Sequence, residues 1–135
     1  MQKFLPMTPV LRVGRPTDRL AEIVAFYKDG LGFTLLSSFE NHDGFDGAIL
    51  GHPHAPWHLE FTHHRGTTVG RAPTQDHLLV LYLPEHDAWE AACARIEAFG
   101  AFPVRSYNPW WDVRGRTYED PDGYRIVLEN SDWNR

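Results

Sequence analysis

The chain has 135 residues, of which 42% are hydrophobic and 23% are charged, and its formal net charge is -5. This composition is that of a globular domain with a hydrophobic core, and it excludes a disordered or fibrous protein. The acidic balance without a run of Lys or Arg argues against nucleic acid as a partner, and no apolar stretch approaches the length of a membrane span. A single cysteine, Cys93, excludes an intrachain disulfide. We therefore expect a cytoplasmic protein with neither a membrane nor a nucleic-acid partner.

The first half of the chain predicts one strand, one helix and three further strands. Val10–Val13 is an apolar run that ends before Pro16, where proline breaks a strand. Thr17 or Asp18 is a suitable N-cap for the helix that follows. The apolar stripe of this helix recurs at helical spacing and consists of Leu20, Ile23, Val24, Tyr27 and Leu31. Further strands are expected at 33–39, 47–50 and 57–62.

The second half repeats that order after a polar, glycine-bearing linker at 64–73. A strand at 77–83 precedes a helix that Asp87 can cap and that Gly100 ends. The remaining elements are an extended run at 102–104, a loop at 108–111 and strands at 115–119 and 124–129. A repeated unit can bury its open face only against its copy. We therefore predict an α+β fold, a single domain in which two tandem βαβββ modules, 8–63 and 74–131, pair to form one open half-barrel cavity.

Two strands carry the residues on which the functional analysis depends. In Trp57–Thr62 successive side chains point to opposite faces, so His58 and Glu60 share a face, as His77 does with the leucines of its own strand. A charged Glu among apolar neighbours is costly unless a ligand, a metal or another side chain meets it. Glu60 and His77 are therefore the candidate catalytic residues.

Two motifs resemble those of a known superfamily. The segment AFYKDGLGF at 25–33 is similar to FY-x-x-x-LGF, and EDPDGYRI at 119–126 is similar to DPDGN-x-IE; both are found in the vicinal oxygen chelate superfamily. That superfamily includes glyoxalase I, bleomycin-resistance proteins, fosfomycin-resistance enzymes and extradiol dioxygenases. The resemblance extends from about Val10 to Glu129. Segments 38–42, 58–62 and 108–111 resemble the YycE-like branch more narrowly.

The resemblance implies four cavity positions that supply ligands in metal-using members. Here they fall on Arg12, Glu60, His77 and Val127. A guanidinium does not coordinate a cation and valine has no donor atom. Glu129 shares a face with Val127 but lies two residues further on, which is a displacement of roughly 6 to 7 Å. We therefore expect no cofactor, with Arg12 in place of the metal, paired bidentately with Glu60 and with His77 hydrogen-bonded nearby.

Five further residues are candidates for contact with a ligand. They are His58, which shares the cavity face with Glu60, together with Trp110, Trp111, Tyr118 and Arg125. The two indoles are expected either to cover the cavity mouth and stack on a planar ligand or to seal the barrel as core. Tyr118 and Arg125 are expected in the cavity wall, or Arg125 pairs with Glu119 or Glu129 at a strand end.

Three functions remain open at this point. The first is a metal-independent small-molecule-binding protein of the bleomycin-resistance type, with an anionic or aromatic ligand in the cavity between the modules. The second is a glyoxalase-like lyase, isomerase or dioxygenase, with Zn, Ni, Mn or Fe held by Glu60, His77 and a third group such as Glu129 or His58. The third is a non-catalytic interaction module with a self-filled cavity. Family analogy also implies a homodimer.

Overall fold

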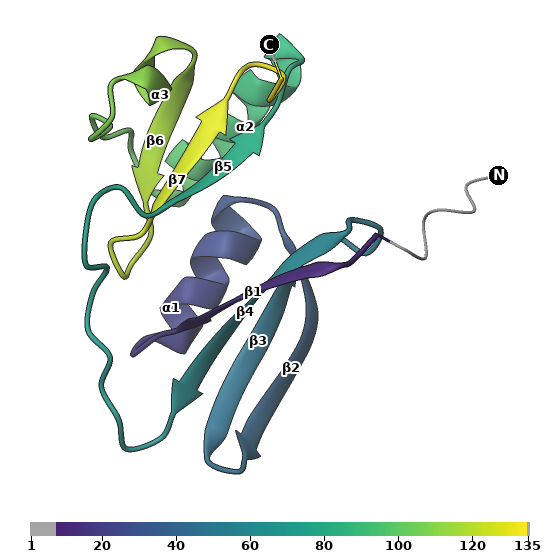
Figure 1. Ribbon diagram of the computed structural model, residues 1–135, viewed down its shortest axis with the longest axis vertical. Coiled ribbons are helices and arrows are strands. Elements are labelled where there is room, and N and C mark those ends of the chain that lie inside the picture. The colour runs from purple at the N-terminus through teal and green to yellow at the C-terminus, as the bar shows by residue number, and fades with distance from the viewer. Residues whose placement is uncertain (1–7, 135) are drawn as a thin grey trace, which may run out of the picture.

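The computed structural model describes residues 8–134, which form two modules with one sheet each (Figure 1). The first module contains β1 (Leu11–Pro16), α1 (Leu20–Ala25), a turn of π-helix η2 (Phe26–Gly30), β2 (Thr34–His42), β3 (Phe45–Gly51) and β4 (Trp57–His64). Its strand order is β1-β4-β3-β2, with β1 parallel to β4. No helix among residues 8–134 is long and apolar enough to span a membrane.

The second module repeats this plan with one strand fewer. It contains β5 (Leu78–Tyr82), α2 (His86–Phe99), α3 (Trp110–Val113), β6 (Gly115–Glu119) and β7 (Arg125–Glu129). The order is β5-β7-β6, with β5 parallel to β7. The predicted α+β class with two repeated modules is confirmed by this arrangement.

Two predicted elements of the second module differ from the structure. The extended run at 102–104 makes a single bridge, from Val104 to Thr117, because Pro103 has no N–H for a ladder. The loop predicted at 108–111 contains the start of α3, since Pro109 favours the first turn of a helix and Asn108 Oδ1 accepts a hydrogen bond of 3.0 Å from the Trp110 N–H.

The N-cap residues of α1 and α2 differ from the predicted ones: they are Arg19 for α1 and Glu85 for α2. The first helix begins at Leu20 with Arg19 at its N-cap position, and Thr17 Oγ1 accepts a hydrogen bond of 3.0 Å from the Arg19 N–H, before the helix. Asp18 instead accepts hydrogen bonds of 2.9 and 2.8 Å from the N–H groups of Val69 and Gly70. Asp18 therefore anchors the linker rather than the helix. In α2 the Glu85 side chain, not Asp87, accepts from the Ala88 N–H at 2.8 Å.

The modules meet through the faces of their sheets that carry the helices. The Phe26 ring of η2 contacts the Phe99 ring of α2 edge to face, with centroids 6.1 Å apart. Gly30 permits this approach, because a Cβ there would lie 3.2 Å from the Phe99 ring. One hydrophobic core therefore joins the two modules, with members from both helices and both sheets.

The turn between β6 and β7 forms a buried polar connection between the modules. Asp120 Oδ2 accepts hydrogen bonds from Tyr27 Oη at 2.7 Å and from Arg15 Nη1 at 3.2 Å. The Arg15 guanidinium also lies 3.8 Å from the centre of the Tyr124 ring. Burial and the nearby carboxylate raise the pKa of the Tyr27 phenol well above its ordinary value, so the phenol remains protonated and acts as the donor.

Candidate functional site

The two faces of the first sheet have different chemical character. Val13 and Leu59 are paired across β1 and β4 and pack against the core, whereas their neighbours Arg12 and His58 are also paired but lie on the opposite face. Glu60, two residues after His58, shares that opposite face. The predicted period of two thus brings Arg12, His58 and Glu60 together, and we call them the Arg12 cluster.

Within the Arg12 cluster the guanidinium is shared between an imidazole and a carboxylate. Arg12 Nε donates a hydrogen bond of 2.9 Å to His58 Nε2, and Arg12 Nη1 lies 3.7 Å from Glu60 Oε2. The predicted contact with Glu60 is present, but it is a single long contact and not bidentate, because Nε is directed to His58. The donor requires a lone pair on His58 Nε2, which leaves the proton of a neutral ring on Nδ1. The Arg12 side chain is 48% exposed and is chemically suited to an anion.

Two glycines, Gly14 and Gly47, lie on the face of the first sheet that carries the Arg12 cluster, since they pair with Glu60 and Thr62 of β4. A Cβ on Gly14 would meet nothing within 4 Å, whereas one on Gly47 would collide with the ring of Phe39 that lies across it. Phe45 and His64 stack on this face with centroids 4.3 Å apart.

The other residues expected with the Arg12 cluster make their contacts elsewhere, and among residues 8–134 no hydrogen bond joins His77 to Arg12, His58 or Glu60. His77 belongs to the second module, where its Nδ1 is 2.7 Å from Thr74 Oγ1. Val127 is fully buried, and Glu129 is 1% exposed at the far end of β7. Among residues 8–134, no three His, Cys, Asp or Glu side chains are placed to hold a metal ion. The donor set that a divalent cation requires is therefore not assembled in this part of the chain.

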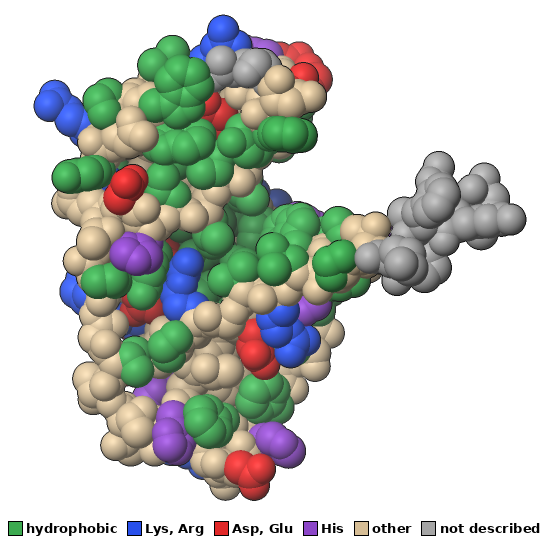
Figure 2. Space-filling view, in the orientation of Figure 1, with side chains coloured by type: hydrophobic (Ala, Val, Ile, Leu, Met, Phe, Trp, Pro, Cys, Tyr) green, Lys and Arg blue, Asp and Glu red, His purple; other side chains and the backbone are tan. Residues whose placement is uncertain are grey.

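A hydrophobic groove lies between the modules, on the side of β1 that carries Leu11 and Val13, and His58 of the Arg12 cluster reaches its edge. Its lining residues are Leu11, Val13, Tyr27, Leu31, Phe33, Trp57, His58, Leu59, Leu79, Val80, Leu81 and Ile126. The cavity is about 220 Å³ and adjoins a second one of about 520 Å³ that shares Phe33, Trp57 and Leu81 with it. Figure 2 shows the hollow between the modules with hydrophobic side chains around it.

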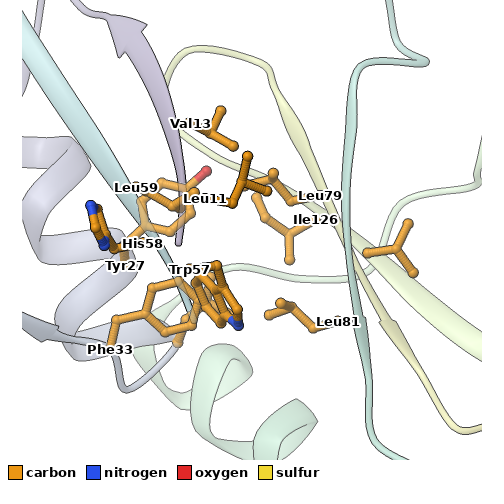
Figure 3. Close-up of a pocket in the computed structure, with 12 residues that line it drawn as sticks. Leu11, Val13, Tyr27, Phe33, Trp57, His58, Leu59, Leu79, Leu81 and Ile126 are labelled. Carbon is orange, nitrogen blue, oxygen red and sulfur yellow. The ribbon is translucent and has the colours of Figure 1, made fainter. Parts of the chain in front are cut away.

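The groove has few polar groups. The Tyr27 phenol is bound to Asp120, and the His58 imidazole lies at the periphery, away from Leu79 and Ile126 (Figure 3). The groove therefore favours an apolar or aromatic ligand.

Tyr118 and Arg125 do not line this groove. Tyr118 is fully buried against α2 and donates a hydrogen bond of 2.6 Å to Glu97 Oε2, and burial raises the pKa of its phenol. Arg125 Nε and Nη2 contact Glu119 Oε2 at 3.0 and 2.9 Å, so the alternative of a strand-end pair is the one present. Arg125 also donates to the Arg105 carbonyl at 2.9 Å, beneath segment 101–114. Val104 of that segment bridges Thr117 of β6 at the edge of the second sheet.

Trp110 and Trp111 lie in a different pocket, not at the mouth of the groove. This tryptophan pocket lies at the end of the second sheet, and its lining residues are Tyr82, Trp110, Trp111, Glu129, Ser131, Asp132 and Trp133. The helix α3 directly precedes β6, whose first residue, Gly115, pairs with Glu129, so both indoles lie beside the end of β7. The strand pattern did not indicate this position.

The sequence pattern did not single out the leucines and valines that line the groove. Leu11 and Val13 alternate with Arg12, and Leu79 and Leu81 alternate along β5. This alternation was readable as one apolar face on each strand. Which face meets the other module was not, because both faces of β1 carry large side chains.

The comparisons with known proteins agree with this fold. Models of the YycE-like N-terminal domain and the YycE-like C-terminal domain match residues 11–62 and 76–130. The uncharacterized protein YycE of Bacillus subtilis (strain 168) is 43% identical over 121 residues, which cover 90% of this chain and 87% of that protein. A 2.0 Å crystal structure of YycE from Bacillus subtilis is 42% identical with a TM-score of 0.85, covering 93% of this chain and 91% of that one.

More distant structures share the fold alone. Trypanothione-dependent glyoxalase I of Leishmania major has a TM-score of 0.69 at 18% identity, covering 90% of this chain and 86% of that one. TnmS3, an antibiotic-binding protein from Streptomyces sp. CB03234, has a TM-score of 0.61 at 24% identity, covering 88% and 91%. With both halves matched by family models and a relative 43% identical over most of its length, the chain belongs to the YycE-like family.

Proposed function

We propose that this protein is a metal-independent small-molecule-binding protein that holds an apolar or aromatic ligand in the groove between its modules. The observation that carries the proposal is the groove itself, which both modules line with aliphatic and aromatic side chains. The groove and its adjoining cavity together fall in the range of small-molecule sites, roughly 300–1,000 Å³. A cavity filled by its own side chains, as in an interaction module, would leave no such space.

The chemistry of the site, and not the fold, supports binding over catalysis. The fold is shared by an antibiotic-binding protein and by glyoxalase I, so it is compatible with either function. The metal-dependent alternative needs Glu60 and His77 in one coordination sphere. In the chain, Glu60 contacts Arg12 and His77 contacts Thr74. A guanidinium beside Glu60 repels a divalent cation from that carboxylate.

The position of Arg12 suggests that the proposed ligand also carries an acidic group. β1 is the edge strand of its sheet, with Leu11 and Val13 toward the groove and Arg12 on its other face. A ligand whose apolar body lies in the groove and whose acidic group passes over this edge would bring the acid to Arg12. We therefore propose that aromatic acids bind more tightly than neutral aromatic compounds of the same size.

The test compares two fluorescent probes, anionic 1-anilinonaphthalene-8-sulfonate and neutral N-phenyl-1-naphthylamine, in titrations of the purified protein. Leu11→Asp puts a carboxylate in the groove wall and should weaken both probes by about tenfold or more. The matched control is Val10→Asp on the adjacent residue, which does not line the groove; both side chains are about equally exposed, at 62% for Val10 and 60% for Leu11. Arg12→Met should weaken only the anionic probe.

Two results would overturn the proposal. Wild-type affinity for both probes in Leu11→Asp would place the ligand outside the groove. Loss of binding after treatment with EDTA, restored by Zn, Ni, Mn or Fe, would refute metal independence and favour the glyoxalase-like alternative.

A further inference from the structure

The tryptophan pocket is built from three segments that meet at the end of the second sheet. Tyr82 ends β5, Trp110 and Trp111 begin α3, and Ser131 to Trp133 follow β7. Asn130 fixes their meeting point, since its N–H donates to the Arg114 carbonyl at 2.8 Å and its Nδ2 donates to the Leu83 carbonyl at 2.9 Å. The turn that carries Ser131 is therefore held beside the indoles of α3.

The lining of this pocket is aromatic and acidic. It contains three tryptophans and one tyrosine together with Glu129 and Asp132, and neither Lys nor Arg lines it. Trp110 and Trp133 are 51% and 77% exposed, which is unusual for side chains of this size. The face of an indole ring attracts cations more strongly than other aromatic side chains do. This combination favours an organic cation and disfavours an anion.

Ser131 provides an independent indication of a ligand. Its side chain is buried, with 6% of the residue exposed, and its Oγ has no hydrogen-bond partner among residues 8–134. Buried hydroxyl groups are normally satisfied by protein, water or a bound molecule. Because Ser131 lines the pocket, an N–H donor placed there would satisfy it.

The size of the pocket limits the ligand to a compact head group. The cavity is about 40 Å³. A single water needs about 10–15 Å³ on the same kind of measure. An ammonium nitrogen and its first one or two carbon atoms fit such a space, but a planar ring that stacks on the indoles does not.

We propose that the tryptophan pocket binds the primary ammonium group of a small-molecule amine. The ammonium N–H groups donate to Ser131 Oγ and to the Glu129 carboxylate, and the adjoining methylene groups lie against the indole rings. This site is separate from the groove between the modules and does not depend on the function proposed for it.

The five tryptophans of the chain allow the site to be tested by position. In a ¹⁵N-labelled protein, titration with n-butylammonium chloride should shift the indole N–H signals of Trp110, Trp111 and Trp133 in a saturable way. The signals of Trp57, in the groove, and Trp89, bound to the Leu128 carbonyl, should not move. Sodium chloride at equal ionic strength and uncharged 1-butanol are the controls, and neither should reproduce the shifts.

Variants and a methylated probe separate the contributions of the pocket. Trp133→Ala should weaken n-butylammonium by about threefold to thirtyfold. Phe102→Ala, which removes an aromatic side chain that is 66% exposed and outside the pocket, should not. Ser131→Ala should weaken n-butylammonium but not n-butyltrimethylammonium, which has no N–H to donate.

The proposal fails if the shifts occur at Trp57 or Trp89, or if 1-butanol gives the same shifts. It also fails if no saturable shift is found up to about 100 mM amine, which is about a hundred times a weak dissociation constant of 1 mM. Tighter binding of the trimethylated probe would refute the hydrogen-bonding role of Ser131 and the assignment to a primary amine. None of these results bears on the groove, which is tested by its own probes.

Discussion

Tyr27 Oη donates a hydrogen bond of 2.7 Å to Asp120 Oδ2, joining the helical turn of the first module to the last turn of the second. Both residues are buried, and Arg15 supplies a further donor to the same carboxylate oxygen. A buried carboxylate is costly unless donors surround it, so this contact ties the stability of each module to the other.

We expect Tyr27→Phe to lower the free energy of unfolding by about 1–3 kcal/mol, because the buried Asp120 carboxylate loses a donor while the ring packing is kept. Tyr107→Phe, at a residue that is 70% exposed, should change it by less than about 0.5 kcal/mol. Urea denaturation measures both values. Equal stability of the two variants would show that the contact between the modules is energetically unimportant.

Two strand glycines, one in each module, provide a matched pair that tests packing around Gly115 in the second module. A Cβ on Gly115 would lie 2.9 Å from the carbonyl oxygens of Leu128 and Trp111, whereas one on Gly14 would meet nothing within 4 Å. We expect Gly115→Ala to cost about 1–3 kcal/mol and Gly14→Ala to be nearly neutral, since backbone atoms cannot move aside as a flexible side chain can. Thermal unfolding of both variants provides the measurement. A Gly115→Ala protein as stable as Gly14→Ala would show that α3 adjusts freely.

Stability should fall in acid partly because of Asp46. Hydrogen bonds from Arg65, at 2.8 and 3.0 Å, and from the Asn41 N–H hold the pKa of Asp46 below its ordinary value of 3.8. Because the folded state has the lower pKa, this contribution is present above pH 3.8 and is lost as the pH falls through the folded value. Asp46→Asn should therefore lose less stability than the wild type between about pH 5 and pH 2. Parallel pH profiles of the two proteins would contradict this account.

We also expect a homodimer in solution. β2 is a nine-residue strand at the edge of its sheet, and it exposes Leu35 and Leu36 at 38% each. An open edge with exposed apolar side chains favours pairing with another chain. Light scattering should give twice the 15.5 kDa of one chain, and Leu35→Lys should shift the protein to the monomer. Thr34→Lys, at the start of the same strand, is the control, and a wild-type monomer at micromolar concentration would refute the expectation.

Local patterns predicted most elements because the forces that set them act within a few residues. The apolar stripe of the first helix and the alternation that groups His58 with Glu60 both follow from the period of a single element. The strand expected at 102–104 is only a single bridge, from Val104 to Thr117. Strand pairing depends on the neighbouring strand as well as on the segment itself, so the residues of the segment alone did not predict it.

The amino-acid sequence alone determined the chemistry of each strand face, the repeat of the modules and their family motifs. Side-chain period and turn residues are local properties, so they can be predicted from neighbouring residues. Only the tertiary structure decided which faces meet. It placed the hydrophobic groove on the side of β1 opposite Arg12, gave His77 a contact with Thr74, and brought Trp110 and Trp111 to a pocket beside Glu129. These outcomes depend on which apolar surfaces bury one another across the whole chain. The hydrophobic effect is not directional, so a local pattern shows that a face is apolar but not which other face will cover it.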